Sequence, residues 1–328
     1  MAPNPGPAEK VDILVFGPPK ATVTKGLSEG FNLHHFENQR DLGRLAPAMA
    51  ERIRGIAVTD LVRVDQAMLS RFPNLEIIAS FGVGYDHIDF HYAKDHNIVV
   101  THTPDVLTEE TADAALGLLI CTVRDFIKAD RFVRSGQWAN QPFPLSPGSM
   151  RDRTVGMVGL GRIGKAIARR LDAMKIPVVY HTRRPAENVL YRHYPKMLDM
   201  AKAVDTLMVM TPGGATTNKL ISAEVINALG PNGVIINMSR GSVVDEEALI
   251  AALKKGDILA AGLDVYVNEP NVPEELRALP NVVLLPHIGS ASVLTRGSMD
   301  QLVAENIKDW FAGKVPPTPV PETPVKGR

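Results

Sequence analysis

Three side chains that could together reduce a carbonyl group each follow a short apolar run of this sequence. They are Arg240, Glu269 and His287. A histidine can give a proton to a carbonyl oxygen near neutral pH, and a carboxylate can stabilise its charged imidazolium through a hydrogen bond. An arginine can pair with a substrate carboxylate and polarise the neighbouring carbonyl. These three residue types predict reduction of a 2-oxo acid.

Each of the three residues alone has a commoner explanation. An isolated histidine is usually structural, an isolated glutamate is usually a solvated loop acid, and an isolated arginine is usually a surface cation. Their shared position favours chemistry, because the apolar runs before them read as parallel strands, and open α/β sheets bind ligands at the carboxyl ends of their strands.

A glycine-rich segment lies earlier, between a strand candidate at residues 154–158 and a helical pattern at 162–175. Gly159 permits a tight turn, Gly161 lets the main chain approach a pyrophosphate, and Gly164 lets the helix pack on the strand. Because the glycines stand in this strand-to-helix context, we expect a dinucleotide to bind here. The segment reads Gly159, Leu160, Gly161, Arg162, Ile163, Gly164.

The next strand candidate ends at Tyr180, where an NAD-binding chain usually carries an acidic residue for the ribose 2′-hydroxyl. Here His181, Thr182, Arg183 and Arg184 follow instead. Arginine offers a planar fork of donors to a 2′-phosphate, which a carboxylate would repel. We therefore predict a preference for NADPH, with NAD(H) as a possible second cofactor. The alternative is a pair of solvated arginines on a loop.

The bulk composition excludes several classes of partner. Lys plus Arg equals Asp plus Glu, at 36 each, so nothing favours a nucleic acid or an anionic membrane. The longest uncharged apolar stretch, residues 114–123, is too short to span a bilayer, and residues 1–5 lack the features of a secretory signal. We expect a cytoplasmic protein whose single cysteine, Cys121, is a small buried side chain.

The 328 residues predict two α/β domains, each with a doubly wound parallel sheet. A Rossmann cofactor domain, residues 108–288, would be inserted into a flavodoxin-like substrate domain formed by residues 1–107 and 289–328. Strand-like runs lie at residues 11–16, 55–58, 75–79 and 97–100 in the first domain, and at 155–158, 178–180, 206–210, 234–237, 260–264 and 282–285 in the second.

The last helix should span residues 292–311 and return to the first domain. A second connecting helix should start near Thr108, a plausible N-cap, and the proline-rich residues 316–324 should form an extended tail. We expect the last helix to bury Leu294, Leu302, Val303, Ile307, Trp310 and Phe311.

The first domain also offers a candidate binding loop at residues 80–86. Its glycine-rich main chain, around Val83 and Gly84, could present N–H groups to a carboxylate, although it could also be a simple turn. His87 and His91 are spaced to share a helix face, but no further ligand set has a recognisable spacing, so we predict no metal.

With these residues in hand, nearly the whole chain resembles the D-2-hydroxyacid dehydrogenase family. Within it the chain is most similar to the glyoxylate/hydroxypyruvate reductases and the plant hydroxyphenylpyruvate reductases. The resemblance rests on the order and spacing of residues 159–164, 237–241, 262–265 with Glu269 and Pro270, and 285–289, and the closer match on residues 103–108 and 287–291.

The resemblance implies a role for each matched residue. Arg240 would bind substrate, Glu269 and His287 would form the acid/base pair, and the main chain of Val83 and Gly84 would hold the substrate carboxylate. Asp264 would orient the nicotinamide carboxamide. The resemblance also implies a homodimer joined through the cofactor domains, and a cofactor site completed by Thr111, Thr211, Pro212 and Gly289.

We therefore expect an NADPH-preferring reductase of small 2-oxo acids, with glyoxylate and hydroxypyruvate first and 2-ketogluconate next. The alternative is an NAD(P)H-sensing scaffold, since some corepressors resemble this family. The chain departs from the commonest pattern at Gly213 and Gly214, where a bulkier residue usually follows the proline, and this leaves the adenine pocket open.

Overall fold

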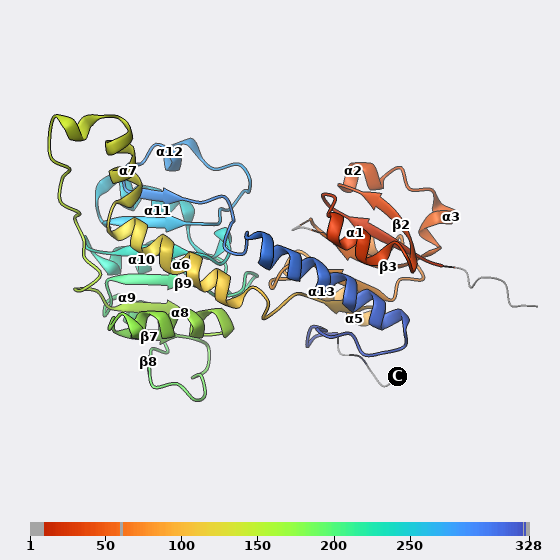
Figure 1. Cartoon of the computed structure of the whole chain (residues 1–328). Helices are drawn as coiled ribbons and strands as arrows, with labels where there is room; N and C mark the ends of the chain where they lie inside the picture. The colour runs from red at the N-terminus through yellow and green to blue at the C-terminus, as the bar shows by residue number, and fades with distance from the viewer. Residues whose placement is uncertain (1–9, 60–61, 324, 326–328) are drawn as a thin grey trace, which may run out of the picture. The chain divides into compact units, whose positions relative to one another are not determined.

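The computed structural model describes residues 10–59, 62–323 and 325, and the prediction about residues 1–5 lies outside them. The chain divides into two compact units (Figure 1). Unit 1 comprises Met1–Leu107 and Ser292–Arg328, and unit 2 comprises Thr108–Ala291. The second boundary predicted from the sequence lies three residues before this division, in the segment that follows the last strand of unit 2.

Unit 1 contains a five-stranded parallel sheet in the order β2-β1-β3-β4-β5. This order is that of the flavodoxin-like doubly wound fold. Strand β2 was not predicted, because its residues are only partly buried at the sheet edge and two of them are histidines. The strands are β1 Val11–Phe16, β2 Phe31–Phe36, β3 Ile53–Val58, β4 Ile77–Ser80 and β5 Val99–Thr101.

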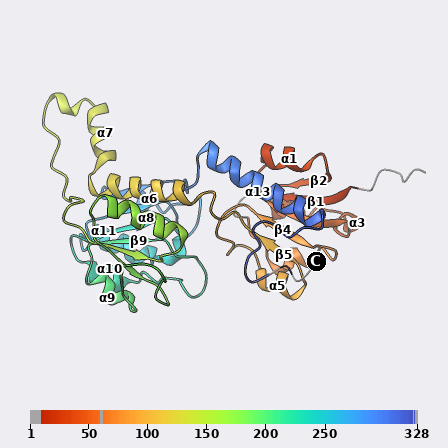
Figure 2. The same cartoon turned by 60° about the horizontal axis from the view of Figure 1, so that its bottom comes forward.

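Helices cover both faces of this sheet. On one face α1 (Ala21–Leu27) lies beside the long helix α13 (Val293–Phe311), which contacts β3 and β4 (Figures 1 and 2). Buried residues of the short helices pack with the strands in a separate hydrophobic cluster. These helices are α2 Gln39–Leu42, α3 Pro47–Ala50, α4 Gln66–Leu69 and α5 Phe90–Asp95.

Helix α13 begins after Ser292, whose hydroxyl accepts a hydrogen bond from the Thr295 N–H at 3.1 Å. Its buried stripe runs through Thr295, Met299 and Val303 toward Trp310. The expectation that Leu294 is buried is wrong, since this side chain is 80% exposed. Leu294 lies about 100° around the helix from Thr295, which places it off the stripe.

Unit 2 contains a seven-stranded parallel sheet in the order β12-β11-β10-β9-β6-β7-β8. If β6 is numbered as strand 1 and the sheet is read from β8, the order is 3-2-1-4-5-6-7. This is the Rossmann order 3-2-1-4-5-6 with β12 added at the edge. The six predicted strands are present, and the two-residue edge strand β8 was not predicted. The strands are β6 Val155–Val158, β7 Val178–His181, β8 Arg192–His193, β9 Thr206–Val209, β10 Val234–Asn237, β11 Ala260–Leu263 and β12 Val282–Leu284.

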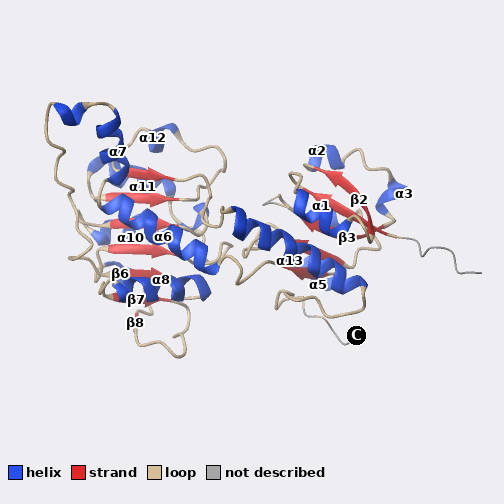
Figure 3. Ribbon diagram, in the orientation of Figure 1, coloured by secondary structure: helices blue, strands red, loops and turns tan. Residues whose placement is uncertain are grey.

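Helices also cover both faces of the second sheet (Figure 3). Alternate strand residues pack toward α6 and α8 on one side and toward α9, α10 and α11 on the other, as expected for strands buried on both faces. The bounds are α6 Thr108–Val123, α8 Arg162–Ala173, α9 Met197–Ala201, α10 Ala223–Leu229, α11 Glu246–Lys255 and α12 Glu274–Arg277, with a 3₁₀ turn at Gly241–Val243.

One segment of unit 2 stands away from its sheet. Helix α7 (Phe126–Arg134) has no buried residue, and it continues through a 3₁₀ turn at Gln137–Ala139 into a long loop (Figures 1 and 2). We refer to residues 126–145 as the arm. Cys121, in the preceding helix, was predicted to be a buried side chain and is partly buried. Among the described helices none is both long and apolar enough to cross a membrane.

Candidate active site

The three predicted catalytic residues follow neighbouring strands of one sheet. Strands β10, β11 and β12 pair in parallel, with Asn237 opposite Leu263 and Leu263 opposite Leu284. The loops that carry Arg240, Glu269 and His287 therefore leave the sheet at the same edge. Parallel pairing brings together side chains that lie 18 to 47 residues apart in the sequence.

His287 and Glu269 form a direct hydrogen bond. The distance from His287 Nδ1 to Glu269 Oε2 is 2.7 Å, and the side chains are 33% and 31% exposed. The other carboxylate oxygen accepts a hydrogen bond from the Tyr266 N–H at 3.0 Å. With Nδ1 facing the carboxylate, Nε2 is the ring nitrogen that can exchange a proton with a substrate.

The pKa of Glu269 lies below its ordinary value. Burial raises this pKa, but four other effects lower it by more than burial raises it. They are the hydrogen bond to His287, the positive charge of that ring, the Tyr266 N–H and the charge of Arg240. Glu269 is therefore a carboxylate at neutral pH.

Asp264 holds the turn that carries His287. Its main-chain carbonyl accepts the His287 N–H at 2.9 Å. Its carboxylate accepts the N–H groups of Ile288 at 2.7 Å and Gly289 at 2.9 Å, and the side chain is only 2% exposed. The left-handed backbone of His287, with φ of +55°, is stabilised by these bonds. Burial raises the pKa of Asp264 despite the two N–H donors.

The loop of Arg240 packs directly against the loop of Glu269. A side chain at Gly241 would place its Cβ 1.9 Å from the main-chain carbon of Tyr266, so only glycine allows this approach. The buried Asn237 braces the same loop by donating to the Arg240 carbonyl at 3.0 Å and accepting the Ser239 N–H at 3.1 Å. The Arg240 guanidinium also donates to the Ser239 carbonyl at 2.8 Å.

The predicted pyrophosphate turn is closely packed at two of its glycines and open at the third. Gly159 has φ of +95°, and a Cβ there would lie 2.6 Å from the Met210 carbonyl oxygen. A Cβ on Gly164 would lie 2.6 Å from the Gly159 carbonyl oxygen. Gly161 is different, because a Cβ there would meet no atom within 4 Å. The open space at Gly161, at the N-terminus of α8, fits a bound phosphate.

The segment predicted to select the 2′-phosphate lies beside this turn, since the Gly159 N–H donates to the His181 carbonyl at 3.0 Å. The Thr182 hydroxyl donates to the Arg184 carbonyl at 2.6 Å, and His193 Nε2 lies 2.9 Å from the Thr182 carbonyl. The side chains of Arg183 and Arg184 are exposed, and neither forms an ion pair within the part of the chain that is described.

Two further groups of predicted cofactor residues lie at the same sheet edge. A Cβ on Gly289 would stand 3.3 Å from the Thr111 methyl group and 3.2 Å from the Asp264 carboxylate, so these three residues lie together. Thr211 and Pro212 follow β9. The Thr217 hydroxyl closes that turn by donating to the Pro212 carbonyl at 2.7 Å, and Gly214 has φ of +120°, which explains the glycine there.

Val83 and Gly84 lie in unit 1, on the loop after β4. Gly82 has φ of +125°. Its N–H donates to the Thr103 hydroxyl at 2.9 Å, and its carbonyl accepts the Thr103 N–H at 2.8 Å. The Val83 carbonyl lies 2.8 Å from His102 Nδ1. Over the described residues, no three His, Cys, Asp or Glu side chains are grouped so that they could hold a metal ion.

Sequence reasoning missed two contributors to this site. Asn237 lies in the matched segment 237–241 but had no predicted role, and Tyr266 lies in no matched segment. Asn237 braces the Arg240 loop, and Tyr266 directs the Glu269 carboxylate through its N–H. The Tyr266 side chain adds support, because its hydroxyl donates to the Leu285 carbonyl at 2.9 Å. The available signals for Asn237 were its position at a strand end and its place in the matched segment 237–241.

Comparison with known proteins identifies the family. Residues 116–289 match the family model described as D-isomer specific 2-hydroxyacid dehydrogenase, NAD binding domain. Glyoxylate/hydroxypyruvate reductase A HPR2 of Arabidopsis thaliana is 42% identical over 95% of this chain and 99% of its own length. Hydroxyphenylpyruvate reductase of Plectranthus scutellarioides is 39% identical, with the same coverage.

A solved structure matches over almost the whole chain. It is the NADPH-dependent glyoxylate/hydroxypyruvate reductase of Sinorhizobium meliloti in complex with NADP and malonate. Its identity to this chain is 50% and the TM-score is 0.94, covering 98% of this chain and 99% of the other. These matches confirm the resemblance and the fold class predicted from the sequence. The chain belongs to the D-isomer specific 2-hydroxyacid dehydrogenase family.

Proposed function

We propose that this enzyme reduces small 2-oxo acids with NADPH, with glyoxylate and hydroxypyruvate as first substrates and 2-ketogluconate next. The observation that carries the proposal is the 2.7 Å hydrogen bond between His287 and Glu269, at the sheet edge that also carries Arg240 and the open turn at Gly161. The names of the Arabidopsis and Sinorhizobium relatives support the same substrates.

Different residues of the chain have different roles in this reaction. When bound, NADPH supplies the hydride that reduces the carbonyl carbon. His287 holds a proton on Nε2 and gives it to the carbonyl oxygen, while Glu269 stabilises the charged ring through Nδ1. Arg240 pairs with the substrate carboxylate and polarises the carbonyl. The main-chain N–H groups of Val83 and Gly84 bind the same carboxylate.

The cofactor preference follows from Arg183 and Arg184. The two exposed guanidiniums follow the strand end at which a ribose is bound in this fold, and no ion pair in the described structure engages them. The rest of the cofactor would be held by residues 159–164, by Thr211 and Pro212, and by Thr111, Asp264 and Gly289 near the nicotinamide. We place the enzyme in the cytosol, where NADPH is available and Cys121 stays reduced.

The scaffold alternative is not favoured. A scaffold would need no aligned proton donor. Here the Asp264 carboxylate accepts the Gly289 N–H beside His287, the Tyr266 N–H donates to Glu269, and Asn237 donates to the Arg240 carbonyl.

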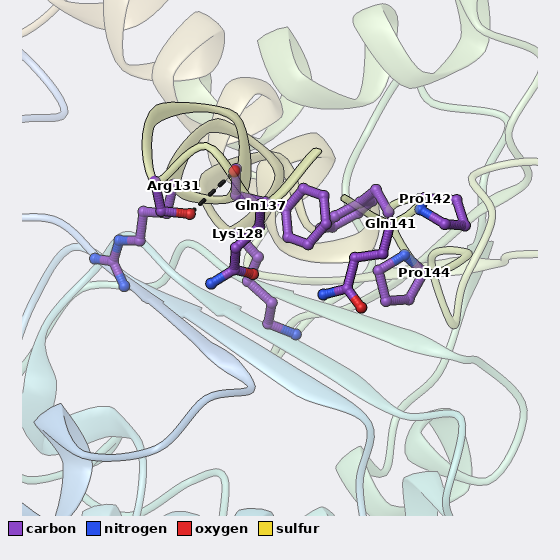
Figure 4. Close-up of a pocket in the computed structure, with 9 residues that line it drawn as sticks. Lys128, Arg131, Gln137, Gln141, Pro142 and Pro144 are labelled. Carbon is purple, nitrogen blue, oxygen red and sulfur yellow. Dashed lines mark hydrogen bonds between the residues drawn. The ribbon is translucent and has the colours of Figure 1, made fainter. Parts of the chain in front are cut away.

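The arm supports a homodimer formed through the cofactor unit. Its exposed apolar side chains include Phe126, Val133, Trp138 and Leu145, which are 48%, 54%, 65% and 96% exposed. The arm also encloses a groove of about 510 Å³ beside Lys128, Arg131, Gln137 and Gln141 (Figure 4). A second copy of the chain would cover this apolar surface, which is costly to leave in water.

Replacing His287 by Ala should lower kcat with glyoxylate about 10²- to 10⁴-fold, because the proton donor is lost. The KM for NADPH should change little. Steady-state NADPH oxidation with glyoxylate, hydroxypyruvate, 2-ketogluconate and hydroxyphenylpyruvate measures this. The exposed His35→Ala serves as the control, and near-normal turnover of the His287 variant would remove His287 from the mechanism.

Replacing Glu269 by Gln should flatten the acid dependence of stability. Because folding lowers the pKa of Glu269, its contribution is full above the ordinary value of 4.5 and is lost as the pH falls through the lower folded value. The wild type should therefore lose more thermal stability than the variant when the pH falls from neutral to about 3. Parallel melting-temperature curves for the two proteins would contradict the assigned pKa shift.

Replacing Arg183 and Arg184 together by Ala should lower kcat/KM for NADPH by roughly tenfold or more, because charge-assisted hydrogen bonds to a phosphate are lost. The value for NADH should change less than about threefold. The exposed Arg277→Ala controls for the loss of positive charge. An equal loss with both cofactors would show that these arginines do not select the 2′-phosphate.

Replacing Trp138 by Ser together with Leu145 by Asp should convert a dimer into a monomer, because the change removes apolar area and adds a charge to the proposed interface. Light scattering coupled to size-exclusion chromatography measures the mass. Leu190→Ser, which changes an equally exposed leucine outside the arm, should remain dimeric. A monomeric wild type would overturn the assembly proposal and leave the catalytic one intact.

A further inference from the structure

The loop that carries Val83 and Gly84 is held at two points by side chains from outside residues 80–86, namely His102 and Glu322. On one side His102 Nδ1 lies 2.8 Å from the Val83 carbonyl. On the other side Tyr85, the residue after Gly84, donates its hydroxyl to Glu322 Oε2 at 2.9 Å. Glu322 is 237 residues away in the sequence, so the C-terminal segment contacts the residue next to a proposed substrate-binding glycine.

The side chain of Tyr85 is held in place by its neighbours, so its hydrogen bond to Glu322 fixes the position of the residue after Gly84. Its ring packs edge-on against Phe90 and His102, with centroid distances of 5.7 and 5.3 Å. Burial and the carboxylate of Glu322 raise the pKa of Tyr85 to about 12, so the hydroxyl remains a donor at any physiological pH. The ring is therefore fixed along its edge by packing and at its tip by one charge-assisted hydrogen bond.

The C-terminal segment is itself fixed along β5. The Thr318 hydroxyl donates to the His102 carbonyl at 2.6 Å, and the Thr318 carbonyl accepts the His102 N–H at 3.2 Å. Further along, the Val320 N–H donates to the Val100 carbonyl at 2.9 Å. Asn306 of α13 donates to the Thr318 hydroxyl at 2.9 Å. Within the predicted extended tail, residues 318–320 are therefore hydrogen-bonded to the edge of the sheet at β5 and the residue after it.

We propose that residues 318–322 are a positioning element for substrate binding: through Thr318 to His102 and through Glu322 to Tyr85, they orient the N–H groups of Val83 and Gly84 toward the substrate carboxylate. This inference rests on the proposed function. Main-chain donors bind an anion well only if they are oriented beforehand, and small displacements are costly.

Glu322 and Tyr85 allow a sharp test of this proposal. Tyr85→Phe and Glu322→Ala should each raise the KM for glyoxylate about tenfold, since a charge-assisted hydrogen bond is lost. The kcat and the KM for NADPH should change less than about threefold, because carboxylate binding is shared by ground and transition states. Glu322→Gln keeps an acceptor oxygen and should stay near wild type.

The double variant Tyr85→Phe with Glu322→Ala should be no worse than either single variant, because both remove one interaction. Tyr191→Phe is the matched control, since Tyr191 makes a similar phenol-to-carboxylate bond with Asp172 in unit 2. Additive effects, or an unchanged KM for glyoxylate in the single variants, would overturn the proposal. So would a rise of the NADPH KM as large as that of the glyoxylate KM.

Binding of oxamate, an unreactive 2-oxo acid analogue, to the NADPH-loaded protein separates this inference from the proposed function. Calorimetry should show about tenfold weaker oxamate binding in Tyr85→Phe and no change in Tyr191→Phe. If the wild type turns over no 2-oxo acid but shows this difference, the proposed function fails and the positioning role stands. Equal oxamate affinity in wild type and Tyr85→Phe overturns the positioning role whatever the turnover.

Discussion

The parallel register of β9, β10, β11 and β12 is the constraint on which the candidate site depends. Asn237 pairs with Val209 on one side and with Leu263 on the other, so these strands end at one level. Strands β9, β10 and β11 are buried and pair with a strand on both sides, whereas the edge strand β12 is partly buried and pairs with β11. The loops that follow these strands therefore leave the sheet at one edge, and the reactive side chains converge there.

The buried carboxylate of Asp264 holds the loop that carries His287. Removing Asp264 from water disfavours its charge, and two main-chain N–H groups offset part of that cost. The offset has a structural consequence, because the N–H groups belong to Ile288 and Gly289, directly after His287. The same bonds that keep Asp264 satisfied hold the imidazole next to Glu269. The role implied for Asp264 toward the nicotinamide is compatible with this one, since each carboxylate oxygen can accept more than one hydrogen bond.

Close main-chain contacts explain why glycine stands at several of these positions. At Gly241 the neighbouring chain is so near that any Cβ would collide with Tyr266, and at Gly159 it would collide with Met210. At Gly161 there is space instead, and the absence of a side chain keeps it open for a ligand. One residue type therefore serves two purposes, namely contact between protein segments and access for a phosphate.

The sequence by itself determined the features that depend on local pattern. The glycine turn, the apolar runs of both sheets, and the strand-end positions of Arg240, Glu269 and His287 could all be read from residue types and spacing. The fold class followed, because strands alternating with helical segments admit few topologies. Weakly patterned edge strands could not be read in this way. Strand β2 is half-buried and β8 has only two residues, so neither shows the apolar run of a central strand.

Only the tertiary structure decided which distant residues meet. Nothing in the local sequence links Glu322 to Tyr85, or Asp264 to the N–H of Gly289. It also decided which side of α13 is buried, and so left Leu294 in solvent. The physical reason is the same in each case: hydrogen bonds and burial depend on which segments pack together, and that depends on the folded chain as a whole.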